Sequence, residues 1–195
     1  MRLLSGLTAA VLLLAACSTP AAAPSPTPSP TPSPTPSPTP SPSPTPQTRF
    51  VFTADLKPSN EVPPIANAEA SCSGKGTFTL NTTKDAAGTI TAATAVFETE
   101  ITGCPAGTEI NIGHIHKAAA GANGGVVVNS GLAKGELTLT GGAGKINKTA
   151  TVVDAGGLTA AALATDIIAN PAGYYMNWHS TLNPGGILRG QLVKG

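Results

Sequence analysis

The chain has 195 residues, and its 11 Lys and Arg nearly balance its 10 Asp and Glu, giving a formal net charge of +1. Charged residues make up 11% of the sequence, which leaves no basic patch and argues against a nucleic-acid partner. Thirteen of the 19 prolines lie between Pro20 and Pro46. The foldable part is therefore residues 49–195, a length typical of one domain.

The amino terminus has the pattern of an export signal. Arg2 precedes an apolar stretch over residues 7–16, which is about half the length of a membrane-spanning helix. This stretch ends in Leu-Ala-Ala before Cys17, which resembles the lipobox of bacterial lipoproteins, where the cysteine is lipidated and begins the mature chain. Ordinary signal cleavage beside an incidental cysteine is the alternative. We expect a signal peptide over 1–16 and a lipid anchor on Cys17 in a bacterial membrane.

A linker is predicted over residues 17–48. From Ser25 to Pro46 it repeats Ser-Pro and Thr-Pro. Proline fixes φ and favours extended geometry in the residue before it, so this tract should form a semi-rigid polyproline II spacer of about 3.1 Å per residue. Its expected role is to hold the domain away from the lipid surface, in the periplasm or at the cell surface.

The domain itself is predicted to be all-β with one short helix. Residues 49–56 alternate, so that Phe50, Phe52, Ala54 and Leu56 share one face, as in a half-buried strand. Clusters of Gly, Asn, Asp and Pro separate further candidate strands at 76–81, 90–101, 109–116, 125–128, 136–140, 145–153, 174–179 and 187–193. Such spacing favours an antiparallel, Greek-key-type sandwich or barrel.

The helix is predicted over residues 158–170, a segment rich in alanine. Thr159 is the candidate N-cap, and Asn170 followed by Pro171 is the stop signal.

Cys72 and Cys104 remain after Cys17 is assigned to the lipid. Disulfides persist in exported domains, so we expect these two to pair. Closing a loop of about 33 residues contributes roughly 3 to 4 kcal/mol in the chain-entropy treatment. Two thiolate metal ligands are the weaker alternative, because the spacing is not Cys-x-x-Cys and neither cysteine adjoins a histidine.

The three histidines are the main chemical signal in the sequence. On a strand, alternate residues point to one face, which here contains Ile110, Ile112, His114 and His116. The two histidines therefore extend an apolar row toward the core. Imidazoles at i and i+2 can reach one ion, and copper, zinc and nickel accept such ligands. His179 can supply a third nitrogen if its strand is a neighbour. Alternatively, the histidines are hydrogen-bonded residues that brace adjacent loops.

Other residues near His179 receive supporting roles. Tyr175 and Asn177 share its face of the predicted strand and are candidates to contact and orient the ligands. Met176 alternates onto the opposite face and is predicted to belong to the core. Arg189 alternates away from its apolar neighbours and is predicted to form an ion pair or brace a turn. The sequence contains no motif of the common hydrolases or phosphate-binding loops.

Several segments together resemble the CHRD domain, named for the repeats in chordin. They are residues 52–56 (FTADL), 60–64 (NEVPP), 113–116 (GHIH), 126–128 (VVV) and 179–192 (HSTLNPGGILRGQL). One departure is Leu188, where an acidic residue often precedes the arginine, so a local Glu–Arg pair is not expected.

The resemblance implies an immunoglobulin-like or superoxide-dismutase-like β-sandwich. Copper/zinc superoxide dismutases also bring a His-x-His strand and a distant histidine to one copper. With only three histidines, this chain lacks the bridging ligand and a recognisable zinc loop. The resemblance therefore implies a copper site on His114, His116 and His179, but not the dismutase activity.

Three functions remain open at this point. The first is a cell-envelope lipoprotein that binds a transition metal, copper, for storage, tolerance or delivery. The second is a surface interaction or structural module without metal, which would meet a protein or polysaccharide partner. The third is a copper-dependent redox enzyme of the superoxide-dismutase type.

Overall fold

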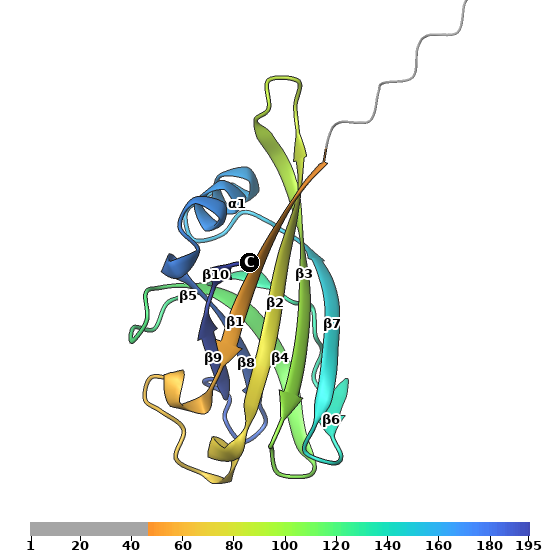
Figure 1. Ribbon diagram of the computed structural model, residues 1–195, viewed down its shortest axis with the longest axis vertical. Helices are drawn as coiled ribbons and strands as arrows, with labels where there is room; N and C mark the ends of the chain where they lie inside the picture. The colour runs from red at the N-terminus through yellow and green to blue at the C-terminus, as the bar shows by residue number, and fades with distance from the viewer. Residues whose placement is uncertain (1–46) are drawn as a thin grey trace, which may run out of the picture. The chain divides into compact units, whose positions relative to one another are not determined.

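A computed structural model describes residues 47–195. The predicted signal peptide, Cys17 and nearly all of the linker lie outside these residues. The described part is an all-β sandwich of two antiparallel sheets with one α-helix, as the sequence predicted, and the sheets do not close into a barrel (Figure 1). None of the helices within this part combines the length and apolar character needed to cross a membrane.

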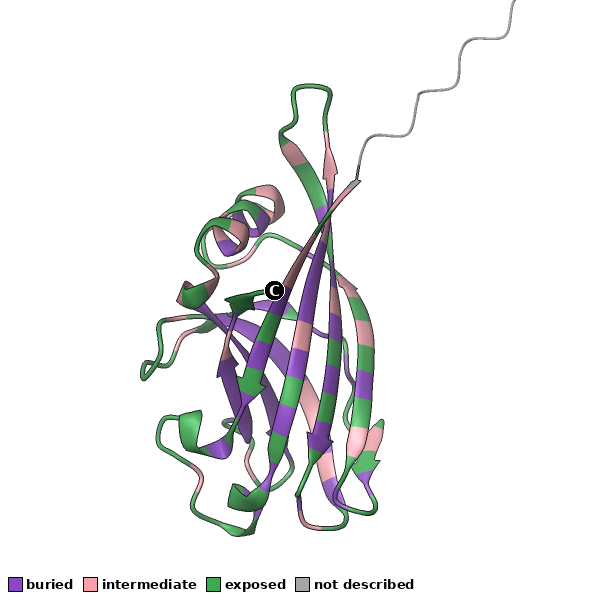
Figure 2. Cartoon of the chain, viewed as in Figure 1, coloured by how far each residue is buried: buried purple, intermediate pink, exposed green. Residues whose placement is uncertain are grey.

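The first sheet contains the long strands in the foreground of Figure 1. Its order is β10 (Val193–Lys194), β1 (Gln47–Leu56), β2 (Ser73–Lys84), β3 (Ile90–Thr102) and β7 (Gly144–Thr151). The predicted alternation in β1 is confirmed, because Phe52, Ala54 and Leu56 are buried and Phe50 is partly buried against the same core. Figure 2 shows the resulting alternation of buried and exposed residues along these strands.

The second sheet carries the histidines. Its order is β5 (Gly125–Asn129), β4 (Thr108–Lys117), β8 (Tyr174–Ser180) and β9 (Leu188–Gln191), and β6 (Leu137–Leu139) also pairs with β4. Every residue of β8 is buried. This strand therefore has one face on the inter-sheet core and a second face that other segments of the chain cover.

Aromatic rings fill the space between the sheets. Phe78 of β2 lies between Phe52 and Phe97, and Phe97 meets Trp178 of β8 edge to face at a centroid distance of 6.2 Å. The Trp178 indole nitrogen donates a hydrogen bond to Thr99 Oγ1 on β3 at 3.1 Å. Such contacts join the two sheets and fix the side of β8 that faces the core.

The helix follows the predicted signals. α1 spans Ala160–Ala169, Thr159 Oγ1 accepts a hydrogen bond from Ala162 N, and Asn170 ends the helix. Three short 3-10 helices accompany it: η1 (Pro58–Asn60), η2 (Ala68–Ser71) and η3 (Pro171–Gly173). The first two belong to the segment between β1 and β2, at the lower left of Figure 1.

The predicted strand at 187–193 is two strands in different sheets. It breaks at Leu192, whose side chain enters the core and whose amide donates to Tyr174 O. β9 thus belongs to the second sheet and β10 pairs with β1 in the first. An alternating pattern continues through this crossing, so the sequence gives no sign of the change of sheet.

The Cys72–Cys104 disulfide is confirmed. Cys72 directly precedes β2 and Cys104 follows β3, so the bond closes the open end of the β2–β3 hairpin. Because both sulfurs are used in this bond, the alternative of two thiolate metal ligands is excluded.

Candidate metal centre

β4 and β8 are adjacent antiparallel strands, and this pairing brings the distant histidine to the His-x-His pair. The register sets Ile112 opposite His179, His114 opposite Asn177, and His116 opposite Tyr175. Directly opposed residues project to the same side of a sheet. All three histidines therefore share one face.

That face is not the predicted one. Ile110 is fully buried in the core, but the register between β4 and β8 shifts between Ile110 and Ile112. This β-bulge reverses the alternation, so that Ile115 rather than His114 follows the apolar row into the core. The expectation that the imidazoles extend the core-facing row is wrong, because a bulge is not visible in the alternation of residue types.

The three rings nevertheless converge. The ring centroid of His114 lies 5.4 Å from that of His116 and 5.1 Å from that of His179, and the third distance is 6.0 Å. One nitrogen from each ring lies within 4.8 Å of the other two. Two nitrogens bound to one ion at about 2.0–2.1 Å are at most about 4.2 Å apart, so shifts of roughly half an ångström bring them to ligand distance.

Backbone carbonyls set the orientation of two rings. His116 Nδ1 lies 2.9 Å from Gly124 O, and His179 Nδ1 lies 2.9 Å from Pro184 O. Since a carbonyl oxygen only accepts hydrogen bonds, we assign the ring proton to Nδ1 in both residues. Each Nε2 then carries a free lone pair, which is the arrangement that a metal-binding imidazole requires.

The free nitrogens point toward one another. His114 Nδ1 lies 3.3 Å from His179 Nε2, and His116 Nε2 is buried without a hydrogen-bond partner. An orphaned buried acceptor beside two other imidazole nitrogens fits a metal ion well, because the ion would use the lone pair that the protein leaves unpaired. The candidate ligand atoms are therefore Nδ1 of His114 and Nε2 of His116 and His179.

Burial keeps the cluster neutral. The three residues are only 8–9% exposed. Burial lowers the pKa of His114 to about 4, and the two neighbouring histidines act in the same direction. Burial also lowers the pKa values of His116 and His179, although their hydrogen bonds to Gly124 and Pro184 oppose this effect. At neutral pH a metal ion therefore does not have to displace the extra proton of an imidazolium.

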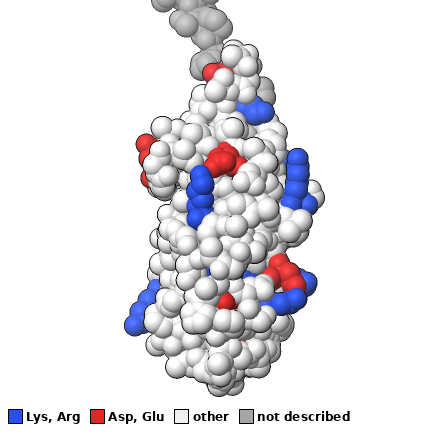
Figure 3. Space-filling model, turned by 90° about the vertical axis from the view of Figure 1, so that its left-hand side faces the viewer, with Lys and Arg blue, Asp and Glu red and all other residues white. Residues whose placement is uncertain are grey.

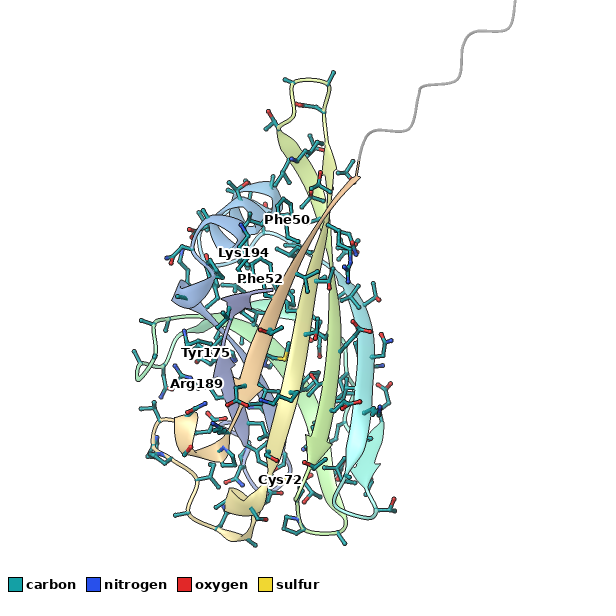
Figure 4. All side chains as sticks on the ribbon, viewed as in Figure 1. Phe50, Phe52, Cys72, Tyr175, Arg189 and Lys194 are labelled. Carbon is teal, nitrogen blue, oxygen red and sulfur yellow. A yellow bond between two sulfur atoms is a disulfide. The ribbon has the colours of Figure 1, made fainter. Side chains whose placement is uncertain are left out.

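Tyr175 supports the cluster from one side. Its ring stacks on that of His116 at a centroid distance of 4.8 Å and an interplanar angle of 5°. The Arg189 guanidinium lies 3.6 Å from the centre of the same tyrosine ring, and both residues are labelled next to one another in Figure 4. The Tyr175 hydroxyl accepts a hydrogen bond from Gly124 N, so it also holds the carbonyl-bearing residue that orients His116.

The remaining residues singled out in the sequence have distinct places. Asn177 lies on the histidine face between His114 and Arg189, as the register shows. Met176 is fully buried in the inter-sheet core, as predicted. Arg189 forms no ion pair within the described residues; it donates to Ala119 O, Ala122 O and Asn123 Oδ1 and so braces the 118–124 turn, one of its two predicted roles.

Three loops cover the histidine face. Arg189 binds residues 118–124, while the Asn123 side chain donates to Val62 O in the segment between β1 and β2. Glu69 accepts hydrogen bonds from Ser180 and Asn183, which ties the same segment to the turn after β8. On the left-hand side of the molecule, shown in Figure 3, charged side chains are few and scattered over a mostly uncharged surface.

Sequence reasoning missed Glu61. It lies beside Asn177 in the loop over the histidine face and is only 6% exposed. In the sequence, Glu61 stands out only as a member of the 60–64 segment that resembles the CHRD domain. The sequence around Glu61 gives no signal of its burial, because the position of this loop depends on contacts with residues more than a hundred positions away.

Residues 52–192 match the family model of the CHRD domain. The chain belongs to the CHRD domain family. The match includes all three histidines and both disulfide cysteines of the CHRD domain. No curated protein and no solved structure matches the chain.

Proposed function

We propose that this protein is an exported lipoprotein whose CHRD domain binds one copper ion through His114, His116 and His179. Lipidation at Cys17 would anchor it to a bacterial membrane, and the proline-rich segment would act as the spacer. The observation that carries the metal site is the orphaned, buried Nε2 of His116 beside the nitrogens of the other two rings.

Copper is the ion that best suits the donors. All three candidate ligands are neutral imidazoles, and affinities of nitrogen sites for divalent ions rise to a maximum at copper. The protein's part is to hold three lone pairs on rigid strands and to exclude water with the covering loops. A bound copper ion would supply Lewis acidity or one-electron chemistry, and the proposed role is storage, tolerance or delivery of the ion.

Titration of the full chain with Cu(II) and Cu(I), in competition with a chromophoric chelator, tests this function. We expect one site per chain. Replacing His114 or His116 by alanine should weaken binding at least about 100-fold. Mutation of a residue that only hydrogen-bonds to a metal ligand typically costs about 10–100-fold in affinity, and loss of the ligand itself should cost more. Asn147→Ala, at an exposed position of β7 in the other sheet, is the control. Unchanged affinity in the histidine variants would exclude the site.

A metal-free recognition module is the second candidate. The 3.3 Å contact between His114 Nδ1 and His179 Nε2 is a hydrogen bond when His114 carries its proton on Nδ1 and donates it to His179, so the cluster can be satisfied in part without an ion. Thermal unfolding separates the two functions. An ion that binds only the folded state adds about 2.7 kcal/mol at 100 times its dissociation constant, whereas a metal-free module should be indifferent to copper and chelator.

A further inference from the structure

Three buried side-chain atoms of the described residues lack a hydrogen-bond partner: His116 Nε2, Asn177 Oδ1 and Glu61 Oε1. All three belong to the histidine face of the second sheet or to the loop above it. A metal ion accounts for the first. The other two atoms, Asn177 Oδ1 and Glu61 Oε1, are oxygen acceptors, and an ion bound to the three histidines would not pair with them.

Glu61 and Asn177 meet above Gly186. A Cβ built on Gly186 would lie 2.7 and 2.8 Å from the two carboxylate oxygens of Glu61 and 2.6 Å from Asn177 Nδ2. Only a residue without a side chain leaves room for this approach, and Gly186 also has a φ of +133°. The carboxylate is thus held against the amide of Asn177.

Asn177 connects this carboxylate to the histidines. It lies directly opposite His114 across β4 and β8, and directly opposite Arg189 across β8 and β9. Opposed side chains on one face have Cβ atoms about 4.5–5.5 Å apart. Glu61 is therefore separated from the nearest candidate ligand by one amide side chain.

The charges on this face require compensation. Three neutral imidazoles give a metal ion no negative partner, and the guanidinium of Arg189, 1% exposed, adds a positive charge to the same face. Burying a charge without a counter-charge is unfavourable. An anionic side chain near the histidines would reduce the free-energy cost of burying the metal ion's charge there.

Two buried carboxylates lie above this face, and they differ in their partners. Glu69 Oε2 accepts hydrogen bonds from both Ser180 Oγ and Asn183 Nδ2, and neither oxygen of Glu69 is among the buried atoms without a partner. Glu61 has one oxygen without a donor. Burial raises the pKa of Glu61 to about 7, while the charge of Arg189 and the Asn177 side chain act against this rise. Glu61 is thus the carboxylate that a nearby cation would stabilise.

We propose that Glu61 is the charge-compensating residue of the metal site, acting across the Asn177 amide, and that it makes the site favour a divalent over a monovalent ion. The inference rests on the proposed metal site. It does not make Glu61 a ligand. Coulomb attraction scales with the charge of the ion, so removing the carboxylate should cost twice as much binding free energy for Cu(II) as for Cu(I). The fold-loss of affinity for Cu(II) should therefore be about the square of the fold-loss for Cu(I).

The experiment measures dissociation constants for Cu(II) and Cu(I) on the full chain and three variants. For Glu61→Gln we expect about a tenfold loss of Cu(II) affinity and about a threefold loss of Cu(I) affinity. Glu61→Asp retains the charge and should keep the wild-type ratio of the two constants. Glu98→Gln removes the same formal charge from an exposed position of β3 in the other sheet, and should change neither constant.

The outcomes separate this inference from the proposed function. If the wild type binds neither ion, both are overturned. If the wild type binds copper but Glu61→Gln leaves the Cu(II)/Cu(I) ratio unchanged, only the role of Glu61 is overturned. Equal shifts of the ratio in Glu61→Gln and Glu61→Asp would show that packing rather than charge is responsible, and would also overturn it.

Discussion

Replacing Arg189 by methionine should destabilise the folded domain more than any change of a surface charge. The side chain is 1% exposed. Its Nη2 lies 2.6 Å from Ala122 O and 3.3 Å from Ala119 O, its Nη1 lies 3.1 Å from Asn123 Oδ1, and its guanidinium stacks on Tyr175. Methionine fills most of the space but removes the arginine donor from all three oxygens, of which Ala119 O keeps a second donor, the amide of Ala122.

The magnitude follows from these contacts. Leaving a buried oxygen without its donor costs about 1–3 kcal/mol, and a desolvated cation–π contact adds up to about 2 kcal/mol. We expect Arg189→Met to lower the free energy of unfolding by about 4 kcal/mol. Arg189→Lys keeps the charge but loses the planar stack and the forked donors, and should cost about 2 kcal/mol.

Urea denaturation followed by the fluorescence of Trp178 measures these values. Arg49→Met is the matched control, because Arg49 is exposed and makes only one long hydrogen bond, 3.5 Å from Nη2 to Thr79 Oγ1. Its free energy of unfolding should stay within about 0.5 kcal/mol of the wild type. A loss below about 1 kcal/mol in Arg189→Met would refute the reasoning that this arginine fixes the 118–124 turn.

Three other variants test separate parts of the account. Gly113→Ala places a Cβ 2.1 Å from two ring carbons of Trp178 and should cost at least about 3 kcal/mol or abolish folding. Gly125→Ala, whose Cβ meets nothing within 4 Å, should be tolerated. A denaturation curve for each variant measures the difference. Cys17→Ser should move the exported protein from the membrane to the soluble fraction, and continued sedimentation with membranes would contradict the anchor. In the metal-free protein, His114 has a pKa of about 4 in the folded state and about 6.5 in the unfolded state, so the unfolded state binds the proton more readily. The free energy of unfolding should therefore fall as the pH drops from about 6.5 to about 4. Glu61, with a pKa raised to about 7, makes the free energy of unfolding change with pH in the opposite direction. The effect of His114→Gln should therefore be measured in a Glu61→Gln background. There, a free energy of unfolding that depends on pH equally with and without His114 would contradict the expectation.

Local sequence patterns predicted most of the strands. β1, β3 and β8 follow alternation of apolar and polar residues, and α1 follows its capping signals at Thr159 and Asn170. These elements are determined by neighbours in sequence, so the pattern carries the information. The crossing at Leu192 was not predictable in this way, because the change of sheet depends on which strand the chain meets next.

The sequence predicted which residues form the candidate site, but not which face of the sheet they occupy. His114, His116 and His179 were identified by type and spacing, and they do converge. Their face was wrong because the bulge after Ile110 shifts the alternation by one residue. The position of Glu61 could not be predicted, since it depends on a covering loop held by distant contacts.

A crystal grown with copper and measured at the copper absorption edge tests the central claim most directly. We expect one anomalous peak inside the domain, about 2.0–2.1 Å from His114 Nδ1, His116 Nε2 and His179 Nε2. A fully occupied copper ion elsewhere, with these three nitrogens still in contact only with each other, would contradict the claim that the histidine cluster is a metal centre.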